Sequence, residues 1–451
     1  MPTPRPTTCP AILIAAPASG QGKTTVTAAL ARLHTRRGRK VRVFKCGPDF
    51  LDPFWLSLAS GAPVHQLDMW MTGEADCRAR LHAAALQADL ILIEGVMGLF
   101  DGEPSAADLA RHFGIAVLAV VDASAMAGTF GALAYGLQHY QPGLPWAGVL
   151  ANKVASSGHA QMLEHALQEP EQWMGALMQG DAYTLPERHL GLVSALELPD
   201  AMARLDAAAD ALATTELGQL DAQQWQRFTV PFNAPEIATQ PAPQLLAGCT
   251  IAVAHDRAFC FIYQANLDAL EQLGARLVFF SPLADSALPL CDALWLPGGY
   301  PELHAQSLSD NTSLAHSVKL HAEAGKPVWA ECGGMMVLFE ELVTKDGQTY
   351  PMWGLLQGSV AMQNRLSALG PQEFEFGAHT MRGHTFHYSK CATDMQPSNR
   401  ARRMSKFASS LQNSAPDGEA LYKAGSVQAS YFHAWFASNL PATAALFLES
   451  T

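Results

Sequence analysis

The sequence lacks the features of a secreted, metal-clustered or nucleic-acid-binding protein. Basic residues are the minority, with 29 Lys and Arg against 41 Asp and Glu, so the formal net charge is −12. No long basic run offsets this charge, which argues against nucleic acid as the main partner. The eight cysteines include no CxxC pair, so neither a zinc site nor a disulfide framework is indicated. The default compartment for such a chain is the reducing cytoplasm.

Long apolar runs are also missing. The apolar stretch 123–137 ends at Gln138 and is interrupted by Gly128, Thr129 and Gly131, whereas a membrane span needs about 20 apolar residues. The first residues lack the apolar segment of a signal peptide, because 11–17 fits a strand better. We therefore expect a cytoplasmic protein without membrane contact.

What the chain does contain is a regular alternation of short apolar runs and helical patterns. Its 451 residues are 49% hydrophobic and 16% charged, which is typical of a globular protein with two or three domains. Each apolar run carries Val, Ile or Leu on both faces, as a parallel sheet covered on both sides requires. Strands are predicted at 11–16, 41–45, 90–94, 116–122 and 148–152, with a helix at 23–37.

A proline-rich segment divides this series from a second one. The pattern weakens before 231–247, where prolines accumulate, and this predicts a domain at 1–230, a linker at 231–247 and a domain at 248–451. Both domains are expected to be α/β, with a mainly parallel sheet in the first. The second series has predicted strands at 250–254, 277–280, 293–297 and 327–330, and a polar surface excursion at 390–424.

The first predicted strand runs into a glycine-rich loop, APASGQGKTT at 16–25, followed by a helix. Backbone N–H groups of such a loop surround phosphate oxygens, a lysine neutralises them, and a hydroxyl reaches Mg²⁺. Pro17 stands where the strict pattern has glycine, and the alternative is a plain turn before an ordinary helix. We interpret the segment as a nucleotide loop whose candidate residues are Ser19, Gly20, Gly22, Lys23, Thr24 and Thr25.

Acidic residues follow two other strands of the first domain. The strand at 90–94 ends on Glu94, and a carboxylate at this end of a parallel strand faces the ligand-binding edge. Glu94 and Thr24 are therefore the candidate Mg²⁺ residues, unless Glu94 simply faces solvent. Asp49 and Asp52 lie in the turn after 41–45, a weak signal because Asp is common in turns.

A cysteine marks the second domain. Cys332 follows the predicted strand 327–330 and precedes two glycines and a predicted helix at 335–340. A sharp turn from strand to helix would expose the thiol and lower its pKa, as in a nucleophile elbow. The alternative is a small buried cysteine without chemistry.

Two further features could serve such a nucleophile. Gly298 and Gly299 follow a predicted strand and could present a backbone N–H to an oxyanion. His433 could act as the base for the thiol, with a core histidine as the alternative. Together with Cys332 they predict a catalytic site in the second domain.

The combined motifs resemble the cobyrinic acid a,c-diamide synthase family, in which a dethiobiotin-synthetase-like ATP domain precedes a class I glutamine amidotransferase-like domain. The resemblance spans nearly the whole chain and is specific through the order and number of its motifs. These are the loop at 16–25, GPDFLDP at 47–53, EGVMGLFDG at 94–102, LPERHLGL at 185–192, PGGYPEL at 297–303, ECGG at 331–334 and RGH at 382–384.

The resemblance implies ATP- and glutamine-dependent amidation of the a and c carboxylates of cobyrinic acid through an acyl phosphate. Cys332 would release ammonia from glutamine, with His433 moving protons and Gly298 and Gly299 at the oxyanion. Mg²⁺ with ATP is the implied cofactor, and a homodimer is one oligomeric state that the resemblance allows. Five residues would line the crevice that holds ATP and the macrocycle, namely Asp49, Phe50, Leu51, Asp52 and Asp101.

Some positions depart from the family pattern or stay open. Trp435 stands two residues after His433, where class I amidotransferases carry an acid, which predicts modest glutaminase activity. Thr385 replaces a glutamate common in relatives, so the role of 382–387 stays open. The cations that could offset repulsion from a polyacidic substrate, or merely lie at the surface, are Arg188, His189 and Arg382.

Other functions remain as alternatives. The same reaction on hydrogenobyrinic acid or nickel-sirohydrochlorin is open, whereas 47–53 and 94–102 favour a,c-diamidation over cobyric acid synthesis. A partitioning-type ATPase switch is the alternative from another class. Such proteins usually have a lysine where Ala18 stands and lack an elbow like 331–334.

Overall fold

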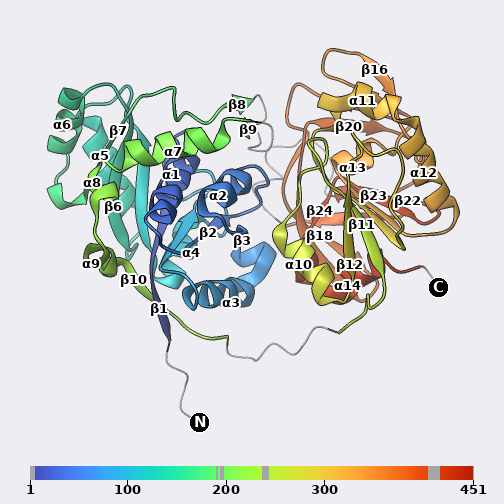
Figure 1. Cartoon of the computed structure of the whole chain (residues 1–451), viewed down its shortest axis with the longest axis horizontal. Coiled ribbons are helices and arrows are strands. Elements are labelled where there is room, and N and C mark those ends of the chain that lie inside the picture. The colour runs from blue at the N-terminus through green and yellow to red at the C-terminus, as the bar shows by residue number, and fades with distance from the viewer. Residues whose placement is uncertain (1–5, 189–190, 193–197, 236–242, 405–416, 450–451) are drawn as a thin grey trace, which may run out of the picture. The chain divides into compact units, whose positions relative to one another are not determined.

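The computed structural model describes residues 6–188, 191–192, 198–235, 243–404 and 417–449. The chain divides into two compact units, Met1–Ala238 and Thr239–Thr451, which Figure 1 shows with their helices and strands. Each unit is an α/β structure with its own sheet, so the predicted two-domain α/β class is confirmed.

The first unit is built on a mainly parallel sheet in the order β3-β2-β4-β1-β5-β6-β7. Strand β10 adds an antiparallel partner to the beginning of β1. Every strand predicted from the apolar runs of this unit is present, and its observed ends lie within four residues of the predicted ones. The bounds are β1 Thr7–Ala15, β2 Val41–Cys46, β3 His65–Leu67, β4 Leu90–Glu94, β5 Ala116–Asp122, β6 Trp146–Val154, β7 Trp173–Met178 and β10 Thr229–Phe232.

Helices cover both faces of this sheet, which is why its strands are apolar on both sides. Along β1, Ile12 and Ile14 belong to one core, whereas Leu13 belongs to the other. The first core is covered by α1 Lys23–Arg36, α2 Asp52–Ser60, α7 Ala201–Leu212, α8 Glu216–Gln219 and α9 Ala222–Trp225, and Figure 1 shows α1 beside α2 and α7. The second is covered by α3 Glu74–Ala85, α4 Ala106–Phe113, α5 Thr129–His139 and α6 Ser157–His165.

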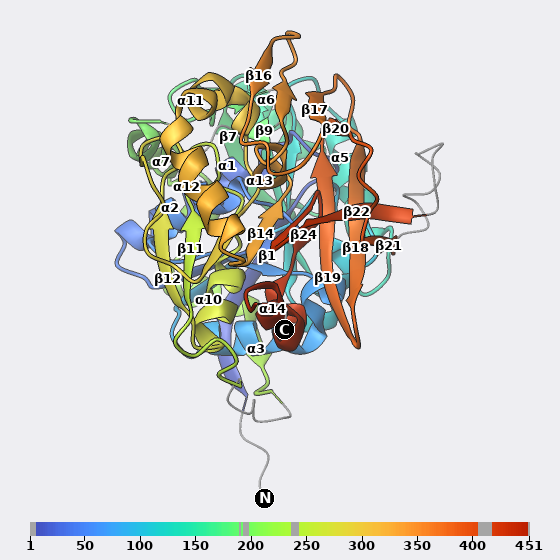
Figure 2. The same ribbon diagram turned by 90° about the vertical axis from the view of Figure 1, so that its right-hand side faces the viewer.

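The second unit combines parallel and antiparallel strands in one sheet, in the order β12-β11-β13-β14-β23-β22-β21-β18-β19-β24. The parallel part is β11 Thr250–Ala254, β12 Arg276–Phe280, β13 Ala293–Leu296, β14 Val328–Glu331 and β23 Val427–Ser430. The antiparallel part is β22 Asp417–Ala424, β21 Asn399–Arg403, β18 Ala368–Phe376, β19 His379–His387 and β24 His433–Ala434, and Figure 2 shows the long β18–β19 hairpin.

Helices and a small sheet complete the second unit. One core includes α10 Gln264–Gln272 and α14 Leu440–Leu446, which lie close together in Figure 2, and the other includes α11 Ala305–Asp310, α12 Thr312–Glu323 and α13 Gly333–Met336. The small sheet holds β15 Glu341–Val343, β16 Thr349–Pro351, β17 Ser359–Met362 and β20 Ser389–Ala392. In the described part of the chain, no helix has the length and hydropathy of a bilayer span.

Two expectations about the second domain are wrong. The helix predicted at 335–340 is instead α13, which ends at Met336, because the carbonyls of Val337, Leu338 and Phe339 accept hydrogen bonds from the backbone of 353–356. The expected surface excursion at 390–424 instead contributes most of β20 and all of β21 and β22, with Leu421 buried in the core. Residues 405–416 of that segment lie outside the described residues.

The segment expected as a linker is partly ordered into both units. Its first residues, Pro231 and Phe232, pair with β1 as the end of β10. Leu246, near its other end, is buried in the core of the second unit and donates its N–H to the Leu273 carbonyl. Residues 236–242 lie outside the described part of the chain.

Candidate active sites

The glycine-rich loop connects the end of β1 to the beginning of α1. Gly22 precedes the helix with φ of 93°, a left-handed conformation that favours glycine. A Cβ at this position would also clash with the side-chain amide of Asn152, which donates a hydrogen bond to the Gln21 carbonyl at 2.9 Å. The loop therefore turns tightly into the helix, and the N–H groups of the first turn of α1 provide the partial positive charge that binds an anion.

The loop lysine is buried and held by backbone oxygens. Lys23 Nζ donates to the carbonyl of Met97 at 2.7 Å and to that of Ala18 at 3.1 Å. Burial and the nearby charge of Lys45 lower the pKa of Lys23. Ser19 and Gly20 are exposed in the loop, and Thr25 is half-buried in the first turn of the helix. The candidate phosphate residues thus share one loop and one helix end.

A buried ion-pair cluster lies beside this loop at the carboxyl ends of β2 and β4. Lys45 Nζ lies 2.6 Å from Asp52 Oδ2, 2.9 Å from Glu94 Oε1 and 3.7 Å from Asp49 Oδ2. Burial alone would lower the pKa of Lys45, but these carboxylates outweigh it and raise that pKa well above its usual value. The lysine is therefore a permanent cation, and the sequence analysis did not identify it as a site residue.

Glu94 joins this cluster to the loop. It is fully buried, and its Oε1 also accepts a hydrogen bond from Thr24 Oγ1 at 2.7 Å. Burial raises the pKa of Glu94 to about 8, so its charged form depends on nearby cations. The alternative of an acid facing solvent is therefore wrong, and Thr24 and Glu94 lie together as expected for a shared ion.

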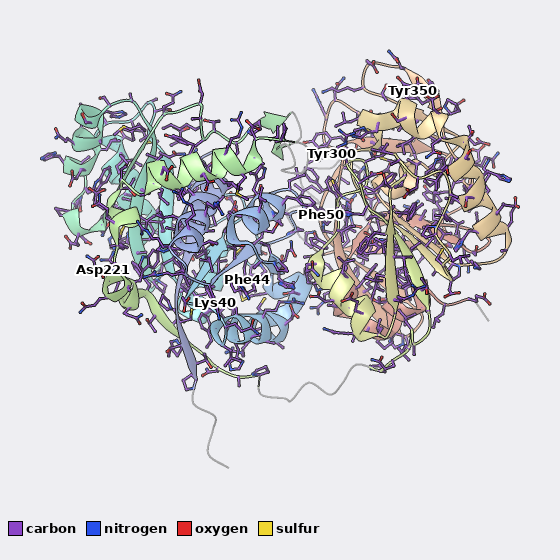
Figure 3. The ribbon with its side chains drawn as sticks, in the orientation of Figure 1. Lys40, Phe44, Phe50, Asp221, Tyr300 and Tyr350 are labelled. Carbon is purple, nitrogen blue, oxygen red and sulfur yellow. The ribbon has the colours of Figure 1, made fainter. Side chains whose placement is uncertain are left out.

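The acidic turn after β2 is packed against the same lysine. Asp49 Oδ1 accepts the N–H groups of Leu51 and Asp52 at 2.9 and 3.0 Å and so begins α2. Phe50 and Leu51 are half-buried in this turn, where Figure 3 labels Phe50. Asp101 lies apart from the lysine, exposed, and accepts the Gly98 N–H at 2.8 Å. Its contact orders the loop that also supplies the Met97 carbonyl.

The elbow predicted around Cys332 is present in the second unit. Cys332 has φ of 47° and ψ of −108°, a strained backbone for a residue with a side chain. Its N–H donates to the Ser430 carbonyl of β23 at 2.8 Å, and its carbonyl accepts the Met336 N–H of α13 at 3.0 Å. Cys332 is only 5% exposed, so the expectation of an exposed thiol is wrong.

The expected lowering of the thiol pKa is wrong. Burial, followed by the carboxyl of Glu302, raises the pKa of Cys332. The helix α13 has only four residues, too few for a substantial helix dipole to oppose this shift. The thiol is therefore neutral at rest and needs a base to become a nucleophile.

A neutral histidine lies in the same unit. His433 is 1% exposed, and its ring stacks on His384 with centroids 4.9 Å apart and planes 16° apart. The second ring is held by Tyr263, whose hydroxyl lies 2.6 Å from His384 Nε2. Burial and the neighbouring histidines lower the pKa of His433 well below its usual value. The imidazole is therefore uncharged, which is the form that can accept a proton.

The glycine turn after β13 joins these parts together. A Cβ on Gly298 would lie 2.5 Å from His433 Cε1, and a Cβ on Gly333 would lie 2.9 Å from the Gly299 nitrogen. The turn is therefore packed between the histidine and the residue after Cys332. The structure brings together the four predicted residues of the second domain.

Known proteins match the chain over nearly its whole length. Families described as "CobQ/CobB/MinD/ParA nucleotide binding domain" and "CobB/CobQ-like glutamine amidotransferase domain" match residues 12–193 and 250–441. A hydrogenobyrinate a,c-diamide synthase of Stutzerimonas stutzeri is 56% identical over 97% of this chain and 98% of its own. The chain belongs to the a,c-diamide synthase family.

Two further members have similar coverage. A hydrogenobyrinate a,c-diamide synthase of Pseudomonas aeruginosa is 54% identical over 97% of each chain. A cobyrinate a,c-diamide synthase of Herminiimonas arsenicoxydans is 47% identical over 97% of this chain and 96% of its own. The resemblance inferred from the sequence is confirmed, and so is the order of the two domains.

The cations expected to face the substrate of this a,c-diamide synthase family member are exposed or described only in part. His189 lies outside the described residues, and the structure describes Arg188 only as backbone of the short strand β8 Glu187–Arg188. Arg382 is exposed on β19. Thr385, also on β19, donates to Glu419 Oε1 at 3.0 Å, and His387 Nε2 lies 3.1 Å from the same oxygen. Their roles toward a substrate stay predictions.

The neutral thiol gives a test by alkylation. Because burial raises the pKa of Cys332, its thiolate fraction grows only above the usual thiol range of about 8.5. We expect the rate of iodoacetamide labelling at Cys332, measured by peptide mass spectrometry, to keep rising with pH up to at least pH 9. A rate that is already constant below pH 7 would instead reveal a thiolate–imidazolium pair and contradict this assignment.

Proposed function

We propose that the chain amidates the a and c carboxylates of cobyrinic acid, using ATP for activation and glutamine as nitrogen donor. The observation that supports this most is the presence of two different sites in one chain, a phosphate loop with a buried charge cluster and a cysteine–histidine elbow. Relatives with the same two domains carry a,c-diamide synthase names over 96–98% of their lengths. We assign the first reaction to 1–230 and the second to 248–451.

The first site would transfer the terminal phosphoryl group of ATP to a substrate carboxylate. Lys23 would neutralise the phosphates, and the N–H groups at the beginning of α1 would hold their oxygens. A substrate oxygen attacks the γ-phosphorus, the bond to the β-phosphate oxygen breaks, and ADP leaves. The acyl phosphate then loses inorganic phosphate when ammonia attacks its carbonyl carbon.

The residues present fit a magnesium ion. Glu94 Oε2 is buried without a hydrogen-bond partner among the described residues, and Thr24 Oγ1 lies beside Glu94 Oε1. No group of three or more His, Cys, Asp or Glu side chains in the described ranges could hold a metal alone. Mg²⁺ bound with nucleotide phosphates needs only one or two protein oxygens. Thr24 and Glu94 would hold it, and it would neutralise charge on the phosphates.

Lys45 completes the proposed charge arrangement. Three carboxylates surround one ammonium group, so the cluster has more negative than positive charge when all are ionised. An added cation at Glu94 would leave Lys45 paired with Asp49 and Asp52. These aspartates would then line the crevice, where Phe50 and Leu51 would help to position the substrate carboxylate. Asp101 would act indirectly, by ordering the loop that contacts Lys23.

The second site would release ammonia from glutamine. His433 takes the proton from Cys332 Sγ, and the sulfur bonds to the carboxamide carbon of glutamine. The carbon–nitrogen bond then breaks, and the histidine proton passes to the leaving nitrogen to give ammonia. Water hydrolyses the thioester to glutamate, while the backbone at Gly298 and Gly299 stabilises the oxyanion.

Hydrogenobyrinic acid is the second candidate substrate, because two relatives at 56% and 54% identity carry that name. We place the reaction in the cytoplasm, where the thiol stays reduced. The distant alternative of an ATPase switch gives no role to the elbow.

Cys332→Ser tests the nitrogen donor. We expect it to lower glutamine-driven diamide formation by about 1,000-fold or more, because a serine hydroxyl is a poor replacement for this nucleophile. Synthesis with ammonium chloride should stay at the wild-type rate, since the first unit is unchanged. Product is measured by chromatography of the corrin, with Cys249→Ser as the matched control. Equal loss with both donors in a folded variant would contradict the role of Cys332.

Lys23→Ala tests the activation step. We expect amidation from either donor to fall by about 100-fold or more, because the substitution removes the positive charge that would stabilise the transferred phosphoryl group. Lys40→Ala is the control, since Lys40, which Figure 3 labels, is exposed and directly precedes β2, whereas the charge cluster lies at the carboxyl end of that strand. The rate of ADP formation with corrin acid present is the direct measurement. Wild-type turnover in Lys23→Ala would refute the assignment of the first unit.

The substrate is tested with the wild-type protein. Cobyrinic acid, hydrogenobyrinic acid and nickel-sirohydrochlorin are offered separately with ATP and glutamine, and kcat/KM is compared for formation of the diamide. We expect corrin acids to be amidated at two carboxylates. Turnover of nickel-sirohydrochlorin alone would contradict a corrin substrate.

A further inference from the structure

A buried acid next to the nucleophile has no role in the chemistry described above. Glu331 is the last residue of β14, immediately before Cys332, and is 2% exposed. Residues so buried are almost never acidic unless they are paired or hydrogen-bonded. Burial raises the pKa of Glu331 to about 8. Keeping an acid at this position therefore needs a structural or chemical reason.

The contacts of Glu331 connect it to the strand that carries His433. Its Oε1 accepts the Trp329 Nε1–H at 2.7 Å and the Ala434 backbone N–H at 3.3 Å. Its Oε2 lies 4.0 Å from His433 Nδ1. One carboxyl group thus holds the backbone directly after His433 and faces the His433 ring.

We propose that Glu331 is the positioning residue of His433 and takes the place of the acid that is missing at Trp435. This inference rests on the proposed glutaminase chemistry. In acid–histidine–nucleophile sites the acid orients the imidazole and stabilises the imidazolium that forms during reaction. Here the acid comes from the strand of the nucleophile instead of from the position two residues after the histidine.

The charges around the ring favour this role. Among the described residues, the titratable groups that act on or face His433 include Glu331 on β14 and two histidines of β19, His384 and His387. Both histidines disfavour a positive charge on His433. Glu331 Oε2 lies 4.0 Å from His433 Nδ1, so its carboxylate can stabilise the imidazolium. With Nδ1 facing Glu331, the thiol proton would go to Nε2.

Glu331→Gln tests the charge while retaining an oxygen for Trp329 and Ala434. The full-length protein is assayed for glutamate release from glutamine with ATP, Mg²⁺ and hydrogenobyrinic acid, between pH 7 and 9. A pKa of about 8 leaves Glu331 mostly neutral at pH 7 and mostly ionised at pH 9. The ratio of wild-type to variant kcat should therefore rise by about tenfold across this range. The KM for glutamine and the ammonia-driven rate should stay unchanged.

Two further variants make the test specific. Glu341→Gln, which replaces an exposed glutamate, should show a ratio near one at every pH. Trp329→Phe keeps the carboxyl but removes the N–H that stabilises its charged form. Its pH profile should therefore shift to higher pH, which also provides an answer if Glu331→Gln does not fold.

The proposal is overturned if Glu331→Gln matches wild type, or if it loses the same factor at every pH while the profile of Trp329→Phe is unshifted. Either result would leave Glu331 as a backbone contact only. Failure of the underlying chemistry is a different result, because then Cys332→Ser would retain glutamine-driven synthesis. The two hypotheses therefore fail on different variants.

Discussion

The arrangement of the first site depends on one buried ammonium group. Lys45 Nζ contacts Asp52 and Glu94 and faces Asp49, inside a sheet edge where unpaired carboxylates would be strongly disfavoured. Burial favours the neutral forms of these acids, and the lysine charge opposes that effect. The same lysine disfavours charge on Lys23. The ammonium charge of Lys45 is therefore present before any nucleotide binds, and Glu94 lies beside Thr24 at the loop.

The second unit uses burial in the opposite way. Burial is the largest cause of the pKa shifts of Cys332 and His433, and it keeps both groups uncharged. A neutral pair costs less to bury than an ion pair. Under the proposed chemistry, proton transfer from the thiol would then take place only during the reaction. The chain thus contains one site built around a permanent ammonium charge and one site whose cysteine and histidine are uncharged at rest.

Much of this could be predicted from the sequence because the relevant signals are local. The strand at 90–94, the loop and the elbow at Cys332 each depend on consecutive residues, and all are confirmed. Lys45 was missed because its partner Glu94 is opposite it only when β2 and β4 are neighbours, and strand order is not encoded in any local pattern. The prediction of a lowered pKa for Cys332 was wrong because the pKa shift depends on burial and on where α13 ends, and neither is a local feature of the sequence.

Strained backbone marks the same places as the chemistry. Among the described residues, the non-glycine residues with positive φ are Met97, Lys153 and Cys332. Met97 presents its carbonyl to Lys23, and Lys153 contacts Asp122 at 2.7 Å and the loop carbonyl of Gly20 at 3.3 Å. Such conformations persist only where surrounding contacts enforce them. In both units, strained backbone therefore lowers folding stability near the ends of the strands. This loss of stability is expected where the backbone must hold side chains and carbonyl groups in one fixed position.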